Sequence, residues 1–206
     1  PAGPFGFSIR KIDDNGVEQW FESLDNYGIT RATSIDTDSN GNIFILSFQG
    51  VLKLNPNGEF QVLSTIGCAV GDSDCTFYTY PQQIRVDNDD NVLFAIRPLY
   101  GGYIDIDPSE NIEYFHSCCT GSYNFRLIKW TNELDNLIWQ SQIYGSQNQY
   151  VTFDGTREIM VKAISFDIDS NNNIYVASTS GENIILSKIS DDGSTLNQPY
   201  SNIISG

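Results

Sequence analysis

The stretch "SIDTDSNGNIFILSF" (34–48) decides the fold, because versions of it return along the chain. The clearest are "IRVDNDDNVLFAIR" (84–97) and "ISFDIDSNNNIYVAS" (164–178), and "FRLIKWTNELDNLIWQS" (125–141) is a weaker copy that aligns on Asn136. Each has two apolar segments around a turn rich in Asp, Asn or Gly, which is typical of a β-hairpin. The sequence therefore predicts a repeat of hairpins.

A second type of hairpin lies between the copies of the first, at 7–24, 50–63, 102–115, 150–161 and 184–197. Alternating pairs of hairpins form four-stranded antiparallel units, which are the blades of a β-propeller. We therefore expect one all-β propeller domain, 1–206, of about four and a half to five blades. It has a half blade at 7–24 and blades at about 33–63, 84–115, 124–161 and 164–197. Such a ring is open, closes imperfectly, is part of a larger ring, or is completed by another subunit.

The first forty residues of this pattern resemble the bacterial seven-bladed beta-propeller repeat, and at this level also NHL-type propellers. Lys11, Ile12, Asp13, Gly16 and Trp20 match the first half of that repeat, and Asp38, Gly41, Asn42, Ile43 and Phe44 match the second half. The later copies depart from it, because Asp90 and Asn172 replace Gly41. The resemblance implies a scaffold and not a particular reaction.

The net charge of −15 and the pI near 4.1 exclude several partners. An acidic surface repels phosphate backbones and anionic membrane faces, so we expect no nucleic acid partner. No apolar run approaches the roughly 18 residues needed to cross a bilayer, so we expect no membrane insertion. The opening "PAGPFGF" lacks an initiator methionine, which predicts a processed or excised chain.

Four cysteines lie in the connections between the predicted blades: Cys68, Cys75, Cys118 and Cys119. Their spacing does not suit a zinc site, so we expect disulfides, with free thiols as the alternative. Three pairings remain open, because the two pairs can close locally or join neighbouring blades. Disulfides favour an extracellular, cell-surface or virion-surface location.

The acidic turns can be interpreted in two ways. Asp and Asn at a hairpin turn accept hydrogen bonds from backbone N–H groups, and Gly or Asn supplies the positive φ. Alternatively, some turns are weak calcium sites, although the bidentate Glu of a calcium loop is missing. We favour turns and expect no cofactor; the calcium candidates are Asp36, Asp38, Asn40, Asp167, Asp169 and Asn171.

Catalytic motifs are scarce, and we expect that the chain is not an enzyme. His116 is the only histidine, which excludes sites built from two or more histidines. A polysaccharide-active enzyme is the less favoured alternative. It would need a cleft that combines at least two of His116, Arg97, Arg31 and a carboxylate.

Tyrosines, arginines and glutamines in the connecting loops have the composition of a recognition surface. The candidates are Tyr27, Arg31, Tyr78, Tyr80, Gln82, Arg97, Tyr100, Tyr123 and Tyr144. We expect a non-catalytic interaction module that binds a protein or a glycan through these loops. The alternative is a structural building block that forms an oligomer, a fibre or a surface assembly through its open blade edges.

Overall fold

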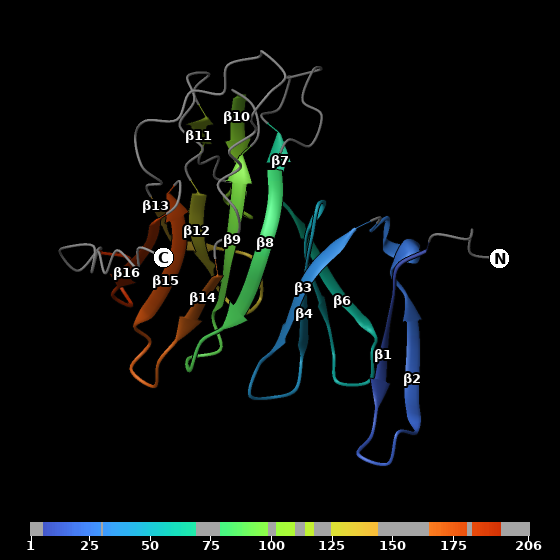
Figure 1. Ribbon diagram of the computed structural model, residues 1–206. Coiled ribbons are helices and arrows are strands. Elements are labelled where there is room, and N and C mark those ends of the chain that lie inside the picture. The colour runs from blue at the N-terminus through green and yellow to red at the C-terminus, as the bar shows by residue number, and fades with distance from the viewer. Residues whose placement is uncertain are drawn as a thin grey trace.

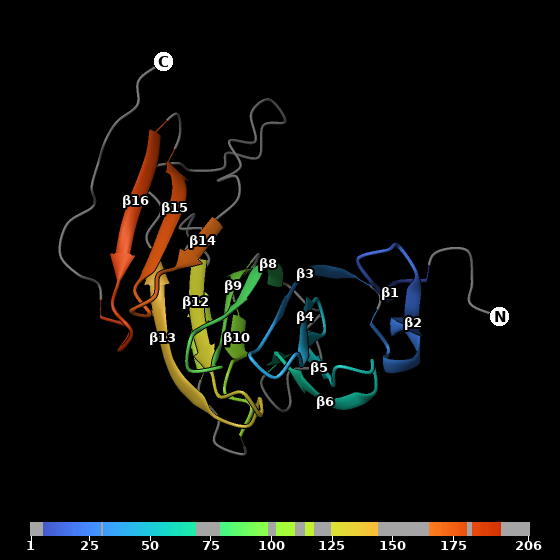
Figure 2. The same ribbon diagram turned by 90° about the horizontal axis from the view of Figure 1, so that it is seen from below.

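The computed structural model describes residues 6–29, 31–68, 79–98, 102–109, 114–117, 125–143, 165–180 and 183–194. These residues form antiparallel β-sheets that follow one another around an open ring (Figures 1 and 2), so the predicted all-β propeller class is confirmed. One short 3-10 helix, η1 (Leu24–Tyr27), connects the first hairpin to the next sheet. Among the described residues, no helix has the length and apolarity that crossing a membrane requires.

The sheets are a hairpin, three blades and a small accessory sheet. The first hairpin pairs β1 (Ser8–Ile12) with β2 (Glu18–Ser23). Blade A has the order β3 (Ala32–Thr37), β4 (Ile43–Ser47), β5 (Gly50–Leu54), β6 (Phe60–Thr65). Blade B has the order β8 (Thr79–Val86), β9 (Val92–Pro98), β12 (Phe125–Trp130), β13 (Leu137–Ile143). Blade C has the order β14 (Ser165–Ile168), β15 (Ile174–Ser180), β16 (Asn183–Ile189), and the accessory sheet pairs β10 (Gly102–Asp105) with β7 (Gly67–Cys68) and β11 (Tyr114–Ser117).

Blade B combines segments that the sequence alignment had assigned to two blades. Strand β9 pairs with β12, and the hairpin of β10 and β11 lies in the accessory sheet instead of completing 84–115. The reason is that 125–141 is a hairpin of the second type: Lys129 lies opposite Trp139, as Lys11 lies opposite Trp20. The alignment on Asn136 hid this equivalence. The remainder of the predicted blade 124–161 lies outside the described residues.

The core consists of three apolar clusters, one between each pair of neighbouring sheets. Strand β4 contributes to two of them, because Ile43 and Ile45 face the first hairpin whereas Phe44 and Leu46 face blade B. A sheet that is covered on both faces needs apolar residues at every position of its central strands. This explains why the run Ile43–Ser47 is buried throughout.

The turns between the first two strands of each blade, which we call first-hairpin turns, contact one another along the ring. The N–H and hydroxyl of Ser39 donate to the Asp90 carboxylate at 2.8 and 2.6 Å, and Asn88 donates twice to Asn172 in the same way. Asp90 and Asn172 have left-handed φ values of 64° and 59°, which are unfavourable for residues other than glycine. These contacts offset that cost. Blade A is preceded only by the hairpin of β1 and β2, which has no first-hairpin turn to supply these bonds. In blade A the residue with the left-handed φ is accordingly a glycine, Gly41.

The turns of the second type of hairpin, which we call second-hairpin turns, are Asp13–Gly16, Asn55–Gly58, Thr131–Leu134 and Ser190–Gly193. The last three receive a lysine from the preceding sheet. Lys11 donates to the carbonyl of Pro56 at 3.2 Å. Lys53 donates to Asn132 and Glu133 at 2.8 and 3.0 Å. In both contacts the second residue of the turn accepts the bond, so these interfaces follow one rule.

The third lysine, Lys129, forms a buried ion pair. Its Nζ lies 2.7 Å from Asp87 Oδ2 and also donates to Asp191, the second residue of the following turn. Burial alone would lower the pKa of Lys129, but the hydrogen bonds and charges of Asp191 and Asp87 outweigh this and raise the pKa. Lys129 is therefore a cation held between blades B and C.

Tryptophans support two of the second-hairpin turns. The Trp20 indole donates to the Pro56 carbonyl at 3.1 Å, and its ring covers Gly58 so closely that an added Cβ would lie 2.8 Å from it. Trp139 and Gly193 repeat this arrangement. The equivalent glycine of the first hairpin, Gly16, has nothing within 4 Å of such a Cβ. Gly16 is thus the corresponding position with no ring over it.

Candidate functional site

Two arginines and two aromatic rings form a continuous series of contacts across blades A and B, which we call the arginine–aromatic cluster. The Arg31 guanidinium lies 5.4 Å from the centre of the Phe48 ring, and Phe48 meets Tyr80 edge to face at 5.3 Å. The Arg97 guanidinium lies 5.2 Å from the centre of the Tyr80 ring. Cation–π contacts of this kind hold planar groups in a fixed order.

The strand connections explain why these four residues meet. Tyr80 lies opposite Arg97 in the β8–β9 pair, which places both side chains at one end of blade B. Phe48 directly follows β4, and its N–H donates to the carbonyl of Arg31, which directly precedes β3. Because β4 runs away from its first-hairpin turn, the cluster lies at the opposite end of the sheets from the acidic turns.

The cluster leaves hydrogen-bond donors and ring surface for a ligand. Tyr80 is 37% exposed. Arg31 is exposed and Arg97 is half-buried, whereas the Arg97 Nε atom itself is buried, without a hydrogen-bond partner within the described part of the chain. Neither Arg31 nor Arg97 forms a salt bridge with a carboxylate of the described residues. Two unpaired guanidinium groups beside aromatic rings suit a ligand that combines a carboxylate with a flat or apolar surface.

Some of the binding residues predicted from the sequence come together here and others do not. Arg31, Tyr80 and Arg97 belong to the cluster, and Gln82 follows on β8, where its amide lies 3.4 Å from the Tyr80 carbonyl. Phe48 was missed; the available signal was an aromatic residue at the end of an apolar run, close to a glycine. The other loop tyrosines lie outside the described residues: Tyr78, Tyr100, Tyr123 and Tyr144.

Tyr27 was also a candidate, but it packs elsewhere. Its ring stacks on Phe60 with centres 5.0 Å apart, and its hydroxyl donates to Glu22 at 2.8 Å. Burial, followed by this hydrogen bond and the charge of Glu22, raises the pKa of Tyr27 to about 12. Tyr27 therefore joins the first hairpin to blade A and does not extend the arginine–aromatic cluster.

Hydrogen bonds within the protein occupy the acidic turns that were considered for calcium. Asp38 accepts the N–H groups of Asn40 and Asn42 at 3.0 and 2.8 Å, and the side-chain amides of Asn42 and Asn132. Burial would raise the pKa of Asp38, but these bonds together lower it. Asp169 is bonded in the same way to the N–H groups of Asn171 and Asn173. The contacts support the interpretation as structural turns.

The remaining calcium candidates contact a neighbouring blade. Asp36 accepts the N–H of Val86 in β8 at 2.9 Å, and Asp167 lies 3.7 Å from Arg85. Among the described residues, no group of three or more His, Cys, Asp and Glu side chains is arranged to hold a metal ion. The acidic residues thus act within and between blades.

The cysteine and histidine predictions lie largely outside the described residues. The backbone of Cys68 belongs to β7 and that of His116 to β11, but neither side chain is described. Cys75, Cys118 and Cys119 lie in segments that are not described. The predicted disulfides therefore stay a prediction.

Comparisons with known proteins identify the fold and no family. No family model matches the chain, and no curated protein matches it. A protein of unknown function from Bacteroides caccae has a similar solved structure, with a TM-score of 0.53 and 13% identity. The alignment covers 92% of this chain and 53% of that one, so the chain spans about half the length of that protein. This similarity supports the fold alone.

Two further solved structures are more distant. One is the calcium-binding protein regucalcin from Agrobacterium tumefaciens, with a TM-score of 0.36, 12% identity, and coverage of 89% of this chain and 63% of that one. The other is a luciferin-regenerating enzyme, with a TM-score of 0.32, 14% identity, and coverage of 82% and 62%. These distances transfer no activity to this chain. The expectation that the chain is not an enzyme is nevertheless corrected, because one of the similar solved structures is titled as an enzyme.

Proposed function

We propose that this propeller is an interaction module that binds a protein or a glycan through the arginine–aromatic cluster. We place it outside the cell, on a cell surface or on a virion surface, and among propellers of the bacterial seven-bladed or NHL type. One observation carries the proposal: a continuous series of cation–π and aromatic contacts at one end of blades A and B joins Arg31, Phe48, Tyr80 and Arg97 in that order. Rigid strands position this surface, as recognition requires.

The chemistry of the cluster narrows the ligand. Aromatic faces stack on sugar rings or on flat side chains, and guanidinium groups bind carboxylates in a bidentate manner. The chain is strongly acidic overall, so two arginines that pair with no carboxylate of the described residues form a local exception that selects negative groups. We therefore favour an acidic glycan or an acidic protein segment.

A glycan array that includes uronic and sialic acids tests the glycan form of this proposal. We expect Tyr80→Ala and Arg97→Ala each to weaken binding about tenfold or more, since each removes an anchor and disrupts the stack. Tyr175→Ala and Arg10→Ala are matched controls, because each removes a cation–π contact elsewhere. Unchanged binding by the cluster variants would refute the proposed surface. The absence of binding to every glycan would favour the acidic protein segment.

A further inference from the structure

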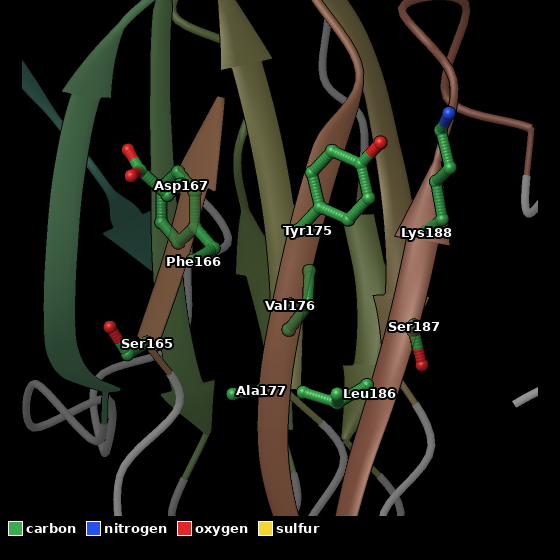
Figure 3. A pocket seen from close by; sticks show the side chains of 9 residues that line it. All are labelled: Ser165, Phe166, Asp167, Tyr175, Val176, Ala177, Leu186, Ser187 and Lys188. Atoms are coloured by element: carbon green, nitrogen blue, oxygen red, sulfur yellow. The ribbon is translucent and has the colours of Figure 1, made fainter. Parts of the chain in front are cut away.

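No blade formed by the described residues covers the outward face of blade C, although this face is equivalent to the blade interface of blade A. Tyr175 on β15 and Leu186 on β16 are 47% and 46% exposed, whereas Phe44, which occupies the place of Tyr175 in blade A, is 0% exposed. Figure 3 shows Lys188 beside Tyr175 and Leu186 beside Ala177 on this face, where they line a pocket of about 470 Å³. Ala177 and Asp167 line the same pocket.

Lys188 repeats the lysines that join the other sheets. Its Nζ lies 5.2 Å from the centre of the Tyr175 ring, as the Nζ of Lys53 lies 5.7 Å from the centre of the Phe44 ring. In blade A, a second-hairpin turn of blade B covers this pair, and the Lys53 side chain is only 6% exposed. Among the described residues, no turn covers Lys188. This face therefore has the chemistry to receive a second-hairpin turn.

The first hairpin has the complementary surface. The second residue of its turn is Asp14. In the other second-hairpin turns this position is Pro56, Asn132 or Asp191, each of which accepts a hydrogen bond from the lysine of the preceding sheet. Asp14 is exposed, and none of the described residues pairs with it. The hairpin face that points away from blade A carries Ile12 and Phe21, which are 58% and 47% exposed. This face thus combines an acidic turn with apolar side chains.

We propose that the first hairpin of a second copy of this chain docks on the outward face of blade C. Asp14 of that copy pairs with Lys188, and its Ile12 and Phe21 cover the pocket beside Tyr175 and Leu186. The argument rests on charge complementarity and on the contact rule that the protein already uses between its own sheets. Figures 1 and 2 place the first hairpin and blade C at opposite ends of the molecule, so the contact joins two copies.

The contact is head to tail, because the two surfaces are different parts of the chain. Such heterologous contacts close into a ring or continue as a filament, according to the rotation between copies. A ring of this kind completes an open propeller between subunits. The proposal does not depend on the arginine–aromatic cluster, since those residues lie at the junction of blades A and B.

Sedimentation velocity of the full chain over a range of concentrations tests the contact. We expect the wild type to associate reversibly, and Lys188→Glu and Asp14→Lys each to weaken association about tenfold or more. Asp25→Lys is the matched control, because it makes the same change of charge as Asp14→Lys at another exposed site. It should associate as the wild type does.

Mixing the two charge-reversed variants provides the decisive arm. In a mixture of Lys188→Glu and Asp14→Lys, the unchanged Asp14 of the first variant can meet the unchanged Lys188 of the second, and the two substituted positions also carry opposite charges. The mixture should therefore associate, whereas neither variant should associate alone. Circular dichroism and a melting curve establish that each variant is folded. A wild type that stays monomeric at every concentration would overturn the proposal, as would variants that associate as strongly as the wild type.

Discussion

The buried ion pair between Lys129 and Asp87 makes the sharpest prediction about what stabilises blade B. Lys129 and Asp87 have side chains that are 4% and 2% exposed, and Lys129 Nζ lies 2.7 Å from Asp87 Oδ2. Replacement by the apolar Lys129→Met leaves the Asp87 carboxylate buried without its cation. Breaking a buried pair from one side costs about 3–5 kcal/mol of unfolding free energy.

Two other lysines on equivalent positions calibrate this value. Lys53→Met should cost about 1 kcal/mol, because its partner Glu133 is 73% exposed and water can solvate the carboxylate that remains. Lys188→Met should change the unfolding free energy of the monomer by less than about 0.5 kcal/mol, since no described carboxylate pairs with Lys188. The expected order is therefore Lys129, then Lys53, then Lys188.

Urea unfolding followed by tryptophan fluorescence at low protein concentration measures these differences. Asp87→Asn in the Lys129→Met background should recover part of the lost stability, because a neutral amide costs less to bury than an unpaired carboxylate. If Lys129→Met costs no more than Lys188→Met, the buried ion pair does not stabilise the fold and the reasoning fails.

Four further predictions test other parts of the molecule. Gly58→Ala should cost about 2–4 kcal/mol of unfolding free energy, because the new Cβ meets a tryptophan ring, whereas Gly16→Ala, with a similar φ and open space, should cost about 1 kcal/mol; equal losses would contradict the ring contact. Asp90→Ala should cost more than Asp90→Gly, by about 1 kcal/mol, since both lose the bonds to the preceding turn but only glycine relieves the left-handed φ. Because folding lowers the pKa of Asp38 from 3.8, the Asp38 carboxylate stabilises the folded protein above pH 3.8, and this stabilisation is lost as the pH falls below that value. Asp38→Asn should therefore flatten the acid side of a plot of unfolding free energy against pH, and an unchanged plot would refute this. A chelator should leave the melting temperature unchanged if the turns are structural, and a lower melting temperature would restore the calcium interpretation.

The sequence predicted the hairpins and the propeller because local rules fix them. Turns with Asp, Asn and Gly repeat with apolar strands, and each of these features is visible within about fifteen residues. The pairing of β9 with β12 was not visible in this way. This pairing joins segments that are separated in the sequence by the hairpin of β10 and β11. The sequence signal for it was the Lys129–Trp139 pair, which matches Lys11–Trp20 only when strand register is considered.

The candidate site was predicted in part for a similar reason. Loop position and composition found Arg31, Tyr80 and Arg97. They could not find Phe48, which reaches the cluster because blades A and B pack together. Composition also selected Tyr27, although a hydrogen bond to Glu22 commits it to packing. Contacts between sheets decide which polar and aromatic residues are left for a partner.

The identity of every blade face depends on β9 lying beside β12, so that pairing is the measurement to make. Nuclear Overhauser contacts between backbone protons of the two strands would report it directly in the labelled protein. We expect contacts between Phe94 and Ile128 and between Ala95 and Leu127, which are opposite each other in this register. Contacts from β9 to residues 102–105 in place of β12 would contradict the blade assignment, the equivalence of the lysines and the open face of blade C.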